Sequence, residues 1–77
     1  MKKRYLRFQA LTAPKAVVYS HSVERIIDVS KLSLIEKNAT AISLLIDSRH
    51  EICYFQTEEQ AEQVYNKIWE MLIQQED

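Results

Sequence analysis

The 77-residue chain contains no glycine, one proline and one cysteine. Without glycine it cannot form the glycine-rich loops that cradle phosphates, nor a nucleophile elbow of the GxSxG kind. Because Cys53 is alone, no internal disulfide can form, and no Cys/His spacing indicates a structural zinc site. We therefore expect no catalytic, metal or cofactor site, a protein that is not an enzyme, and a Cys53 that is an inert core residue.

Long hydrophobic runs are missing as well. A basic N-terminus precedes Tyr5 and Leu6, as in a signal peptide, but Arg7 and Gln9 interrupt the apolar segment. No run approaches the roughly 20 apolar residues that a membrane-spanning helix needs. We expect a cytoplasmic protein with no membrane partner, and a single small domain over residues 1–77. A domain of this size is marginally stable alone, which favours oligomerisation.

The formal net charge of −1 conceals an asymmetry along the chain. Residues 1–25 contain six Lys or Arg and one acid, a balance of +5, whereas residues 26–77 contain four and ten, a balance of −6. The two balances sum to the net charge of −1. Such polarity can steer an anionic partner or a second copy of the chain toward the basic end.

The clearest local signal is a C-terminal amphipathic helix. Thr57 can accept a hydrogen bond from the backbone of Gln60, as in a capping box, and two glutamates follow Thr57 where negative charge suits a helix N-terminus. Apolar residues then recur every three or four positions, and Trp69 and Ile73 widen this stripe. The stripe consists of Ala61, Val64, Tyr65, Ile68 and Leu72.

The first half of the chain indicates strands. Residues 5–11 alternate between apolar and polar, which is typical of a half-buried strand, and Pro14 ends that pattern. Residues 16–20 favour a short strand, and residues 21–25 fit either a loop or one helical turn. Residues 26–29 and 32–36 are expected to form strands separated by a kink at Ser30 and Lys31.

Two further strands, residues 41–47 and 51–56, are predicted to form a hairpin across residues 48–50. Asn38 is the residue expected to adopt a left-handed conformation in the turn before this hairpin. Since tight turns of the Asn-Gly kind are absent, the turns must be longer or use Asn, Asp and Ser.

These elements predict an α+β fold. It consists of an antiparallel sheet of about four to five strands, followed by one C-terminal amphipathic helix packed on one face. The predicted core comprises Leu6, Phe8, Ile27, Val29, Ile35, Leu44, Ile46, Tyr54, Val64, Tyr65, Ile68 and Leu72.

Both faces of the predicted hairpin have large apolar side chains, but one helix can cover only one face. The open face would present either Leu45, Cys53 and Phe55 or Ile42, Ile46 and Tyr54. Exposed apolar surface of this kind marks an interface. We expect a non-enzymatic interaction module that binds protein, a homodimer packing through the sheet or the Trp69 edge of the helix. The candidate interface residues are Leu45, Phe55 and Trp69.

The alternative function is binding of single-stranded nucleic acid. Cations alternate with aromatic residues near the N-terminus, and cations can contact phosphates while exposed rings stack on bases. The predicted order of elements resembles, in topology alone, single-strand-binding folds of the Whirly kind. Against this, the chain is not basic overall. The candidate contacts are Lys2, Lys3, Arg4, Tyr5, Arg7 and Lys15.

Overall fold

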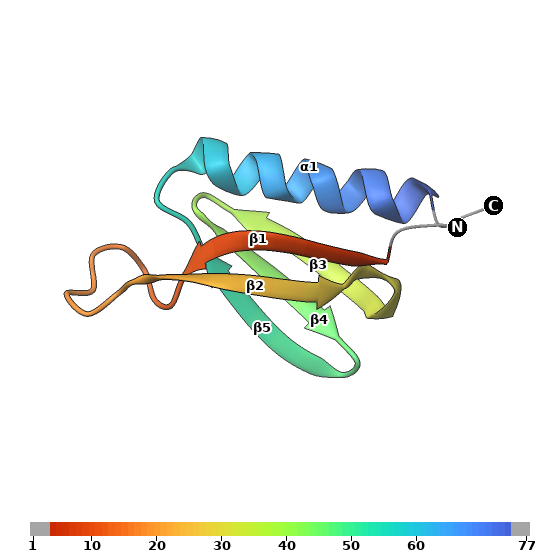
Figure 1. The fold of residues 1–77 in the computed structure, drawn as a ribbon, viewed down its shortest axis with the longest axis horizontal. Helices are drawn as coiled ribbons and strands as arrows, with labels where there is room; N and C mark the ends of the chain where they lie inside the picture. The colour runs from red at the N-terminus through yellow and green to blue at the C-terminus, as the bar shows by residue number, and fades with distance from the viewer. Residues whose placement is uncertain (1–3, 75–77) are drawn as a thin grey trace.

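The computed structural model describes residues 4–74, and it has the predicted α+β fold. Five antiparallel strands precede one C-terminal helix that lies across one face of the sheet (Figure 1). The elements are β1 (Tyr5–Leu11), β2 (Ser22–Asp28), the 3-10 turn η1 (Val29–Lys31), β3 (Leu32–Asn38), β4 (Ala41–Ile46), β5 (Arg49–Tyr54) and α1 (Glu58–Gln74).

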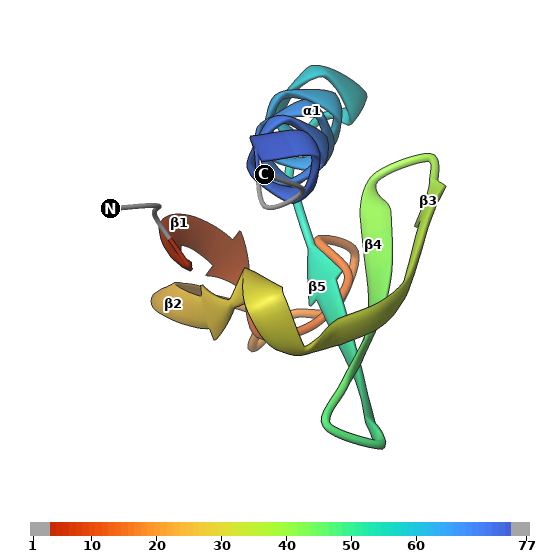
Figure 2. The same cartoon turned by 90° about the vertical axis from the view of Figure 1, so that its right-hand side faces the viewer.

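The sheet is strongly curled because a very short segment joins its two edges. The strand order is β2-β1-β5-β4-β3, so β2 and β3 lie on opposite edges. In a flat sheet these edges would be about 19 Å apart, at about 4.8 Å per strand spacing. The connection between them is only η1, which spans about 8 Å as a 3-10 turn and about 13 Å if fully extended. The sheet therefore bends until the two edges approach each other (Figure 2).

Because of the curl, β1 and β5 pair over only a small part of their length. Strands β1 and β2 pair along their whole length, from Tyr5 with Asp28 to Leu11 with Ser22. Within the described residues, β1 pairs with β5 only where Leu11 meets Tyr54. Beyond that point the β1–β2 hairpin and the β3–β4–β5 meander diverge, and α1 lies over the concave side between them (Figure 2).

The core occupies this concave side. Val29 of η1, Leu44 of β4 and Ile68 of α1 are almost fully buried there. Of the other predicted core residues, Ile27 and Ile46 are buried, and six more are partly buried against this cluster. Those six are Leu6, Phe8, Ile35, Val64, Tyr65 and Leu72. The buried residues outside the predicted core set are Ala10, Leu11, Ile42, Phe55 and Met71, together with Ala61 of the predicted helix stripe and Cys53, which was expected to be an inert core residue.

Tyr54 is the predicted core residue that lies elsewhere, and the hairpin turn explains why. The expected loop over residues 48–50 would set Leu45 beside Cys53. The observed turn has two residues, Asp47 and Ser48, and pairs Leu45 with His50 instead. An odd register shift moves every side chain of a strand to the opposite face. Tyr54 is consequently on the outer face.

Both hairpin turns of the meander are short despite the absence of glycine. Asp47 and Ser48 both have positive φ, 54° and 68°, which is typical of a type I′ turn. The turn between β3 and β4 places Ala39, at φ 54°, in the left-handed region, not Asn38 as expected. The prediction of longer turns is wrong, whereas the use of Asp and Ser is confirmed.

Two N-terminal segments also differ from the expectations. No strand forms over residues 16–20. Residues 14–20 form two consecutive reverse turns, with Val17 N–H donating to Pro14 C=O and Ser20 N–H to Val17 C=O. Residues 22–25 belong to β2, because they pair with β1. The inward position of Arg25, which forms an ion pair with Glu51, interrupts the alternation that would have indicated this strand.

The predicted helix start is confirmed. Thr57 Oγ1 accepts a hydrogen bond of 3.1 Å from Gln60 N–H, and the helix begins at the next residue, Glu58. Ala61 and Ile68 of the predicted stripe are fully buried, so the helix buries the face that the sequence indicates.

Replacement of Ala39 by glycine should stabilise the protein. A left-handed conformation costs a residue with a Cβ about 1–2 kcal/mol. Glycine avoids this cost, but it loses more conformational entropy on folding, which offsets part of the gain. We expect Ala39→Gly to raise the free energy of unfolding by about 1 kcal/mol in urea titrations. The control Ala16→Gly, at an exposed loop position outside the positive-φ set, should give no gain. A loss of stability in Ala39→Gly would contradict the inference that the positive φ of Ala39 strains the backbone.

Candidate interaction surfaces

The outer face of the sheet has an apolar stripe that crosses three strands. Leu34 of β3 lies directly opposite Leu45 of β4, and Ile52 of β5 is the diagonal neighbour of Leu45. Tyr54 continues the stripe along β5. Leu34 is 48% exposed and Ile52 39% exposed, whereas Leu45 and Tyr54 are half-buried. We call Leu34, Leu45, Ile52 and Tyr54 the outer stripe.

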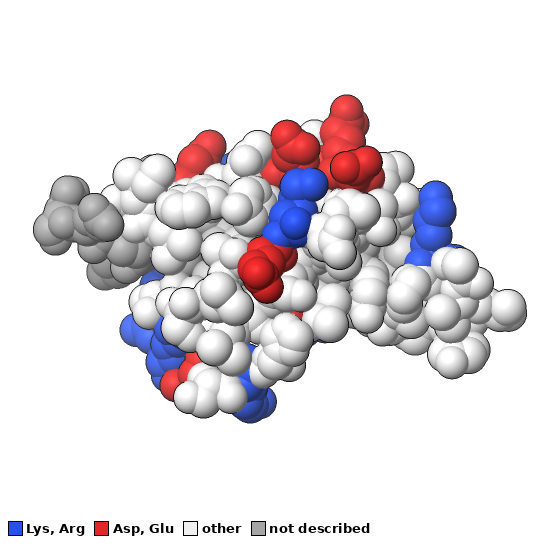
Figure 3. All heavy atoms as spheres, turned by 180° about the vertical axis from the view of Figure 1, so that it is seen from behind, with Lys and Arg blue, Asp and Glu red and all other residues white. Residues whose placement is uncertain are grey.

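Most residues between the members of the outer stripe are small and uncharged, but Glu36 of β3 also lies on this face, opposite Ser43. Ala41 pairs with Tyr54, and Ser43 pairs with Ile52, so small side chains lie between the large apolar ones. Seen from behind, acidic side chains gather along the helix and basic ones toward a lower corner, and one acidic and one basic side chain also lie near the middle of the view (Figure 3). Two copies of this face can therefore meet through the outer stripe only in an arrangement that keeps their Glu36 carboxylates apart.

The three candidate interface residues have different positions. Leu45 belongs to the outer stripe. Phe55 is 3% exposed, so its expectation is corrected: its ring lies in the core, 6.0 Å from that of Phe8. Trp69 is 45% exposed on α1, with Ile73 one turn further on. At 100° per residue these two lie on the helix flank away from Gln63 and Lys67.

The basic N-terminal segment is mostly paired with acids of β2. Arg4 Nη2 lies 2.5 Å from Asp28 Oδ2, its Nε lies 3.2 Å from the same oxygen, and its guanidinium lies 5.1 Å from the Tyr5 ring centre. Arg7 Nε lies 3.5 Å from Glu24 Oε2 on an exposed surface. Lys15 Nζ donates to the Gln56 carbonyl at 3.3 Å. Lys2 and Lys3 lie outside the described residues.

A groove runs between β1 and α1. One hollow, of about 290 Å³, lies near the helix N-terminus between Gln9 of β1 and Gln60 of α1. A second, of about 470 Å³, lies further along, beside Phe8. Both hollows include Gln63 and Val64, so we treat them as one β1–α1 groove.

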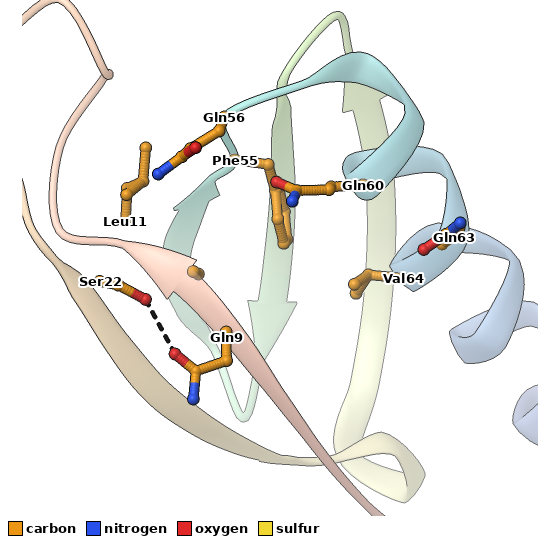
Figure 4. Close-up of a pocket in the computed structure, with 9 residues that line it drawn as sticks. Gln9, Leu11, Ser22, Phe55, Gln56, Gln60, Gln63 and Val64 are labelled. Carbon is orange, nitrogen blue, oxygen red and sulfur yellow. Dashed lines mark hydrogen bonds between the residues drawn. The ribbon is translucent and has the colours of Figure 1, made fainter.

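The end of this groove near Gln60 is lined without any charged residue. Four glutamines surround a floor that includes Phe55 and Val64, and Ser22 Oγ donates to Gln9 Oε1 at 2.8 Å (Figure 4). The lining of this end comprises Gln9, Ala10, Leu11, Ser22, Phe55, Gln56, Gln60, Gln63 and Val64. No signal in the sequence indicates this site, because glutamines scattered over β1, the β5–α1 loop and α1 form no motif.

Other chemistry has little support in residues 4–74. Burial raises the pKa of the Cys53 thiol, and the side chain is fully enclosed in the core. The described residues contain no group of three or more His, Cys, Asp or Glu suited to a metal ion. Within the same range, no helix combines the length and the apolar character that crossing a bilayer requires.

Comparison with known proteins adds no relative: no family model, no curated protein and no solved structure matches this chain.

The Arg4–Asp28 pair predicts a specific pH dependence. The Arg4 hydrogen bond, followed by that of Ser30, lowers the pKa of Asp28 from 3.8 to about 2. A lowered pKa in the folded state stabilises it above the ordinary value, and this contribution disappears as the pH falls toward about 2. We expect Asp28→Asn to be less stable than the wild type at neutral pH and the difference to close as the pH falls from about 4 to about 2.

Urea titrations of the two proteins at several pH values measure this difference. In parallel, carboxyl NMR should show that Arg4→Met raises the pKa of Asp28. A stability difference that stayed constant down to about pH 2 would contradict the pairing.

Proposed function

We propose that this protein is a non-enzymatic protein-binding module that forms a homodimer through the outer stripe. The observation that supports this most directly is the row of Leu34, Leu45 and Ile52 on the face that no helix covers. A twofold dimer brings a patch onto itself, and an offset between the two stripes would let the apolar side chains meet while the Glu36 carboxylates stay apart.

The size of the patch sets the expected strength. Stable interfaces take about 800 Å² from each partner, and four partly exposed side chains supply only part of that area. The contact must therefore include the small residues between them, Ala41 and Ser43, and its dissociation constant is expected in the micromolar range.

Charge placed on the outer stripe should dissociate the dimer. We expect sedimentation velocity to show a wild-type dimer at tens of micromolar and a monomer for Ile52→Lys combined with Leu34→Lys. The control Val18→Lys changes an almost fully exposed loop residue away from the stripe and should leave the dimer intact. A monomeric wild type at about 200 µM, far above a micromolar dissociation constant, would refute the proposal. Dissociation by Trp69→Lys alone would place the interface on the helix flank instead.

The second candidate function remains binding of single-stranded nucleic acid. Tyr5 is 60% exposed with the Arg4 guanidinium 5.1 Å from its ring centre, and Arg7 lies two residues further along the same face of β1. The acids paired with Arg4 and Arg7 weaken this candidate, because phosphates would have to displace Asp28 and Glu24. This is why we rank it second.

Anisotropy of a labelled mixed-sequence single strand, at about 50 and about 200 mM salt, tests this candidate. If it is correct, binding should weaken steeply with salt, because phosphate contacts release counterions. Arg4→Glu with Arg7→Glu should then abolish binding without dissociating the dimer. The absence of binding at high protein concentration would eliminate this candidate.

A further inference from the structure

The backbone of β1 has one edge that is paired and one that is open. Thr12 N–H donates to His21 C=O at 2.9 Å, and Val29 N–H donates to Arg4 C=O at 2.6 Å. These bonds mark the two ends of the β1–β2 ladder. Since hydrogen-bonded pairs alternate along an antiparallel ladder, Leu6, Phe8 and Ala10 are the intervening β1 residues that bond to β2.

The other residues of β1 direct their backbone groups away from β2. Leu11 uses this side to pair with Tyr54 of β5, where the two strands meet. Tyr5, Arg7 and Gln9 have the same orientation, but within the described residues they have no partner in β5. Their N–H and C=O groups form a free strand edge inside an otherwise paired sheet.

This free edge faces the β1–α1 groove. Figure 1 shows β1 between β2 on one side and the helix on the other, so the edge opposite β2 is turned toward α1. The hollows of the groove include Arg7 and Gln9 on the strand wall and Gln63 and Lys67 on the helix wall. A strand edge that faces a groove closed by a helix is the arrangement in which an extended peptide adds to a sheet.

We propose that the β1–α1 groove binds an extended peptide segment of a partner protein, which pairs with the backbone of Tyr5, Arg7 and Gln9. About five peptide residues would match the length from Tyr5 to Gln9. Unlike an apolar cleft alone, the groove offers unpaired donors and acceptors at the spacing of a strand, which is the spacing of a peptide backbone.

The side chains that line the groove define the peptide sequence it would accept. The glutamine end has no charge and suits uncharged polar side chains, whose amides or hydroxyls can both donate and accept. At the other end, Leu6 and Phe8 provide an apolar floor, and Arg7 and Lys67 outnumber the single acid Glu70. We expect an apolar residue and an acidic residue at the peptide end that lies there.

The probe is a phage-displayed library of random linear twelve-residue peptides, selected on the full chain. The tightest synthetic peptide is then measured by anisotropy. We expect enriched peptides with an apolar and an acidic residue close together. Failure to enrich any peptide over a column without protein would overturn the proposal.

The strand edge permits a sharp mutational test. Arg7 N–H is not used by β2, so Arg7→Pro removes a donor from the groove without removing a bond of the β1–β2 ladder. We expect Arg7→Pro to weaken peptide binding by about tenfold or more. The matched control Arg7→Ala removes the same guanidinium but keeps the N–H, so it should weaken binding clearly less than Arg7→Pro does. Equal effects of the two variants would contradict backbone pairing.

A second pair of variants tests the helix wall if Arg7→Pro does not fold. Gln63→Arg fills the groove from an exposed helix position and should weaken binding, whereas Glu62→Arg, which lines neither hollow, should not. N-methylation of successive peptide residues should block binding at every second position, because a strand pairs through alternate residues. An effect without this period would refute strand addition.

Different variants test the dimer proposal and the peptide proposal, so either can be refuted without the other. Ile52→Lys with Leu34→Lys should dissociate the dimer and leave the affinity of the peptide unchanged. Gln63→Arg should weaken the peptide and leave the dimer intact. If Gln63→Arg dissociated the dimer, the groove would be occupied by a second copy of the chain, and the peptide proposal would be overturned.

Discussion

The three-residue connection between β2 and β3 is the constraint on which the rest of the fold depends. It joins two strands at opposite edges of the sheet, and a flat sheet would hold those edges too far apart for it. Val29, fully buried at this corner, anchors the connection against α1. The resulting curl creates a concave side that a single helix can fill, so a chain of 77 residues forms a core without glycine-rich turns or disulfides.

The same curl separates β1 from β5. Two pairs of side chains occupy the space between the diverging halves: the Phe8 and Phe55 rings, and the ion pair of Arg25 with Glu51. This half-buried ion pair links β2 to β5 where backbone pairing is absent, and Arg49 Nη2 lies 4.0 Å from the other Glu51 carboxylate oxygen. The free edge of β1 is thus a consequence of how the sheet closes.

Local signals in the sequence were sufficient for the elements but not for their register. Thr57, the helical stripe and the alternation over residues 5–11 each depend on neighbours a few residues away, and all three are observed. The face of Tyr54 and the burial of Phe55 depend on the length of one turn. That turn contains Asp47 and Ser48 in a left-handed conformation that residues with a Cβ adopt only at a cost, so the sequence favoured a longer loop.

The candidate surfaces, too, could be predicted from the sequence only in part. An exposed stripe on one sheet face could be expected, because both faces of the hairpin contain large apolar residues. The residues that form this stripe could not be predicted, because only the register decides whether Leu45 lies beside Cys53 or beside His50. The β1–α1 groove had no local signal at all. Its free edge results from strand order, and its glutamines come from β1, the β5–α1 loop and α1, which the curl brings together.

The outer stripe and the β1–α1 groove lie on different sides of the molecule, and this placement has a functional consequence. The stripe is on the outer face of β3, β4 and β5, whereas the groove is bounded by the helix on the concave side. A dimer formed through the outer stripe would therefore leave two grooves open, related by a twofold axis. Two weak peptide sites in one particle would bind a partner with repeated segments far more tightly than either site alone, by a factor of about 10² to 10⁴. Modest interfaces of the kind proposed for the stripe and the groove would then be sufficient for selective binding.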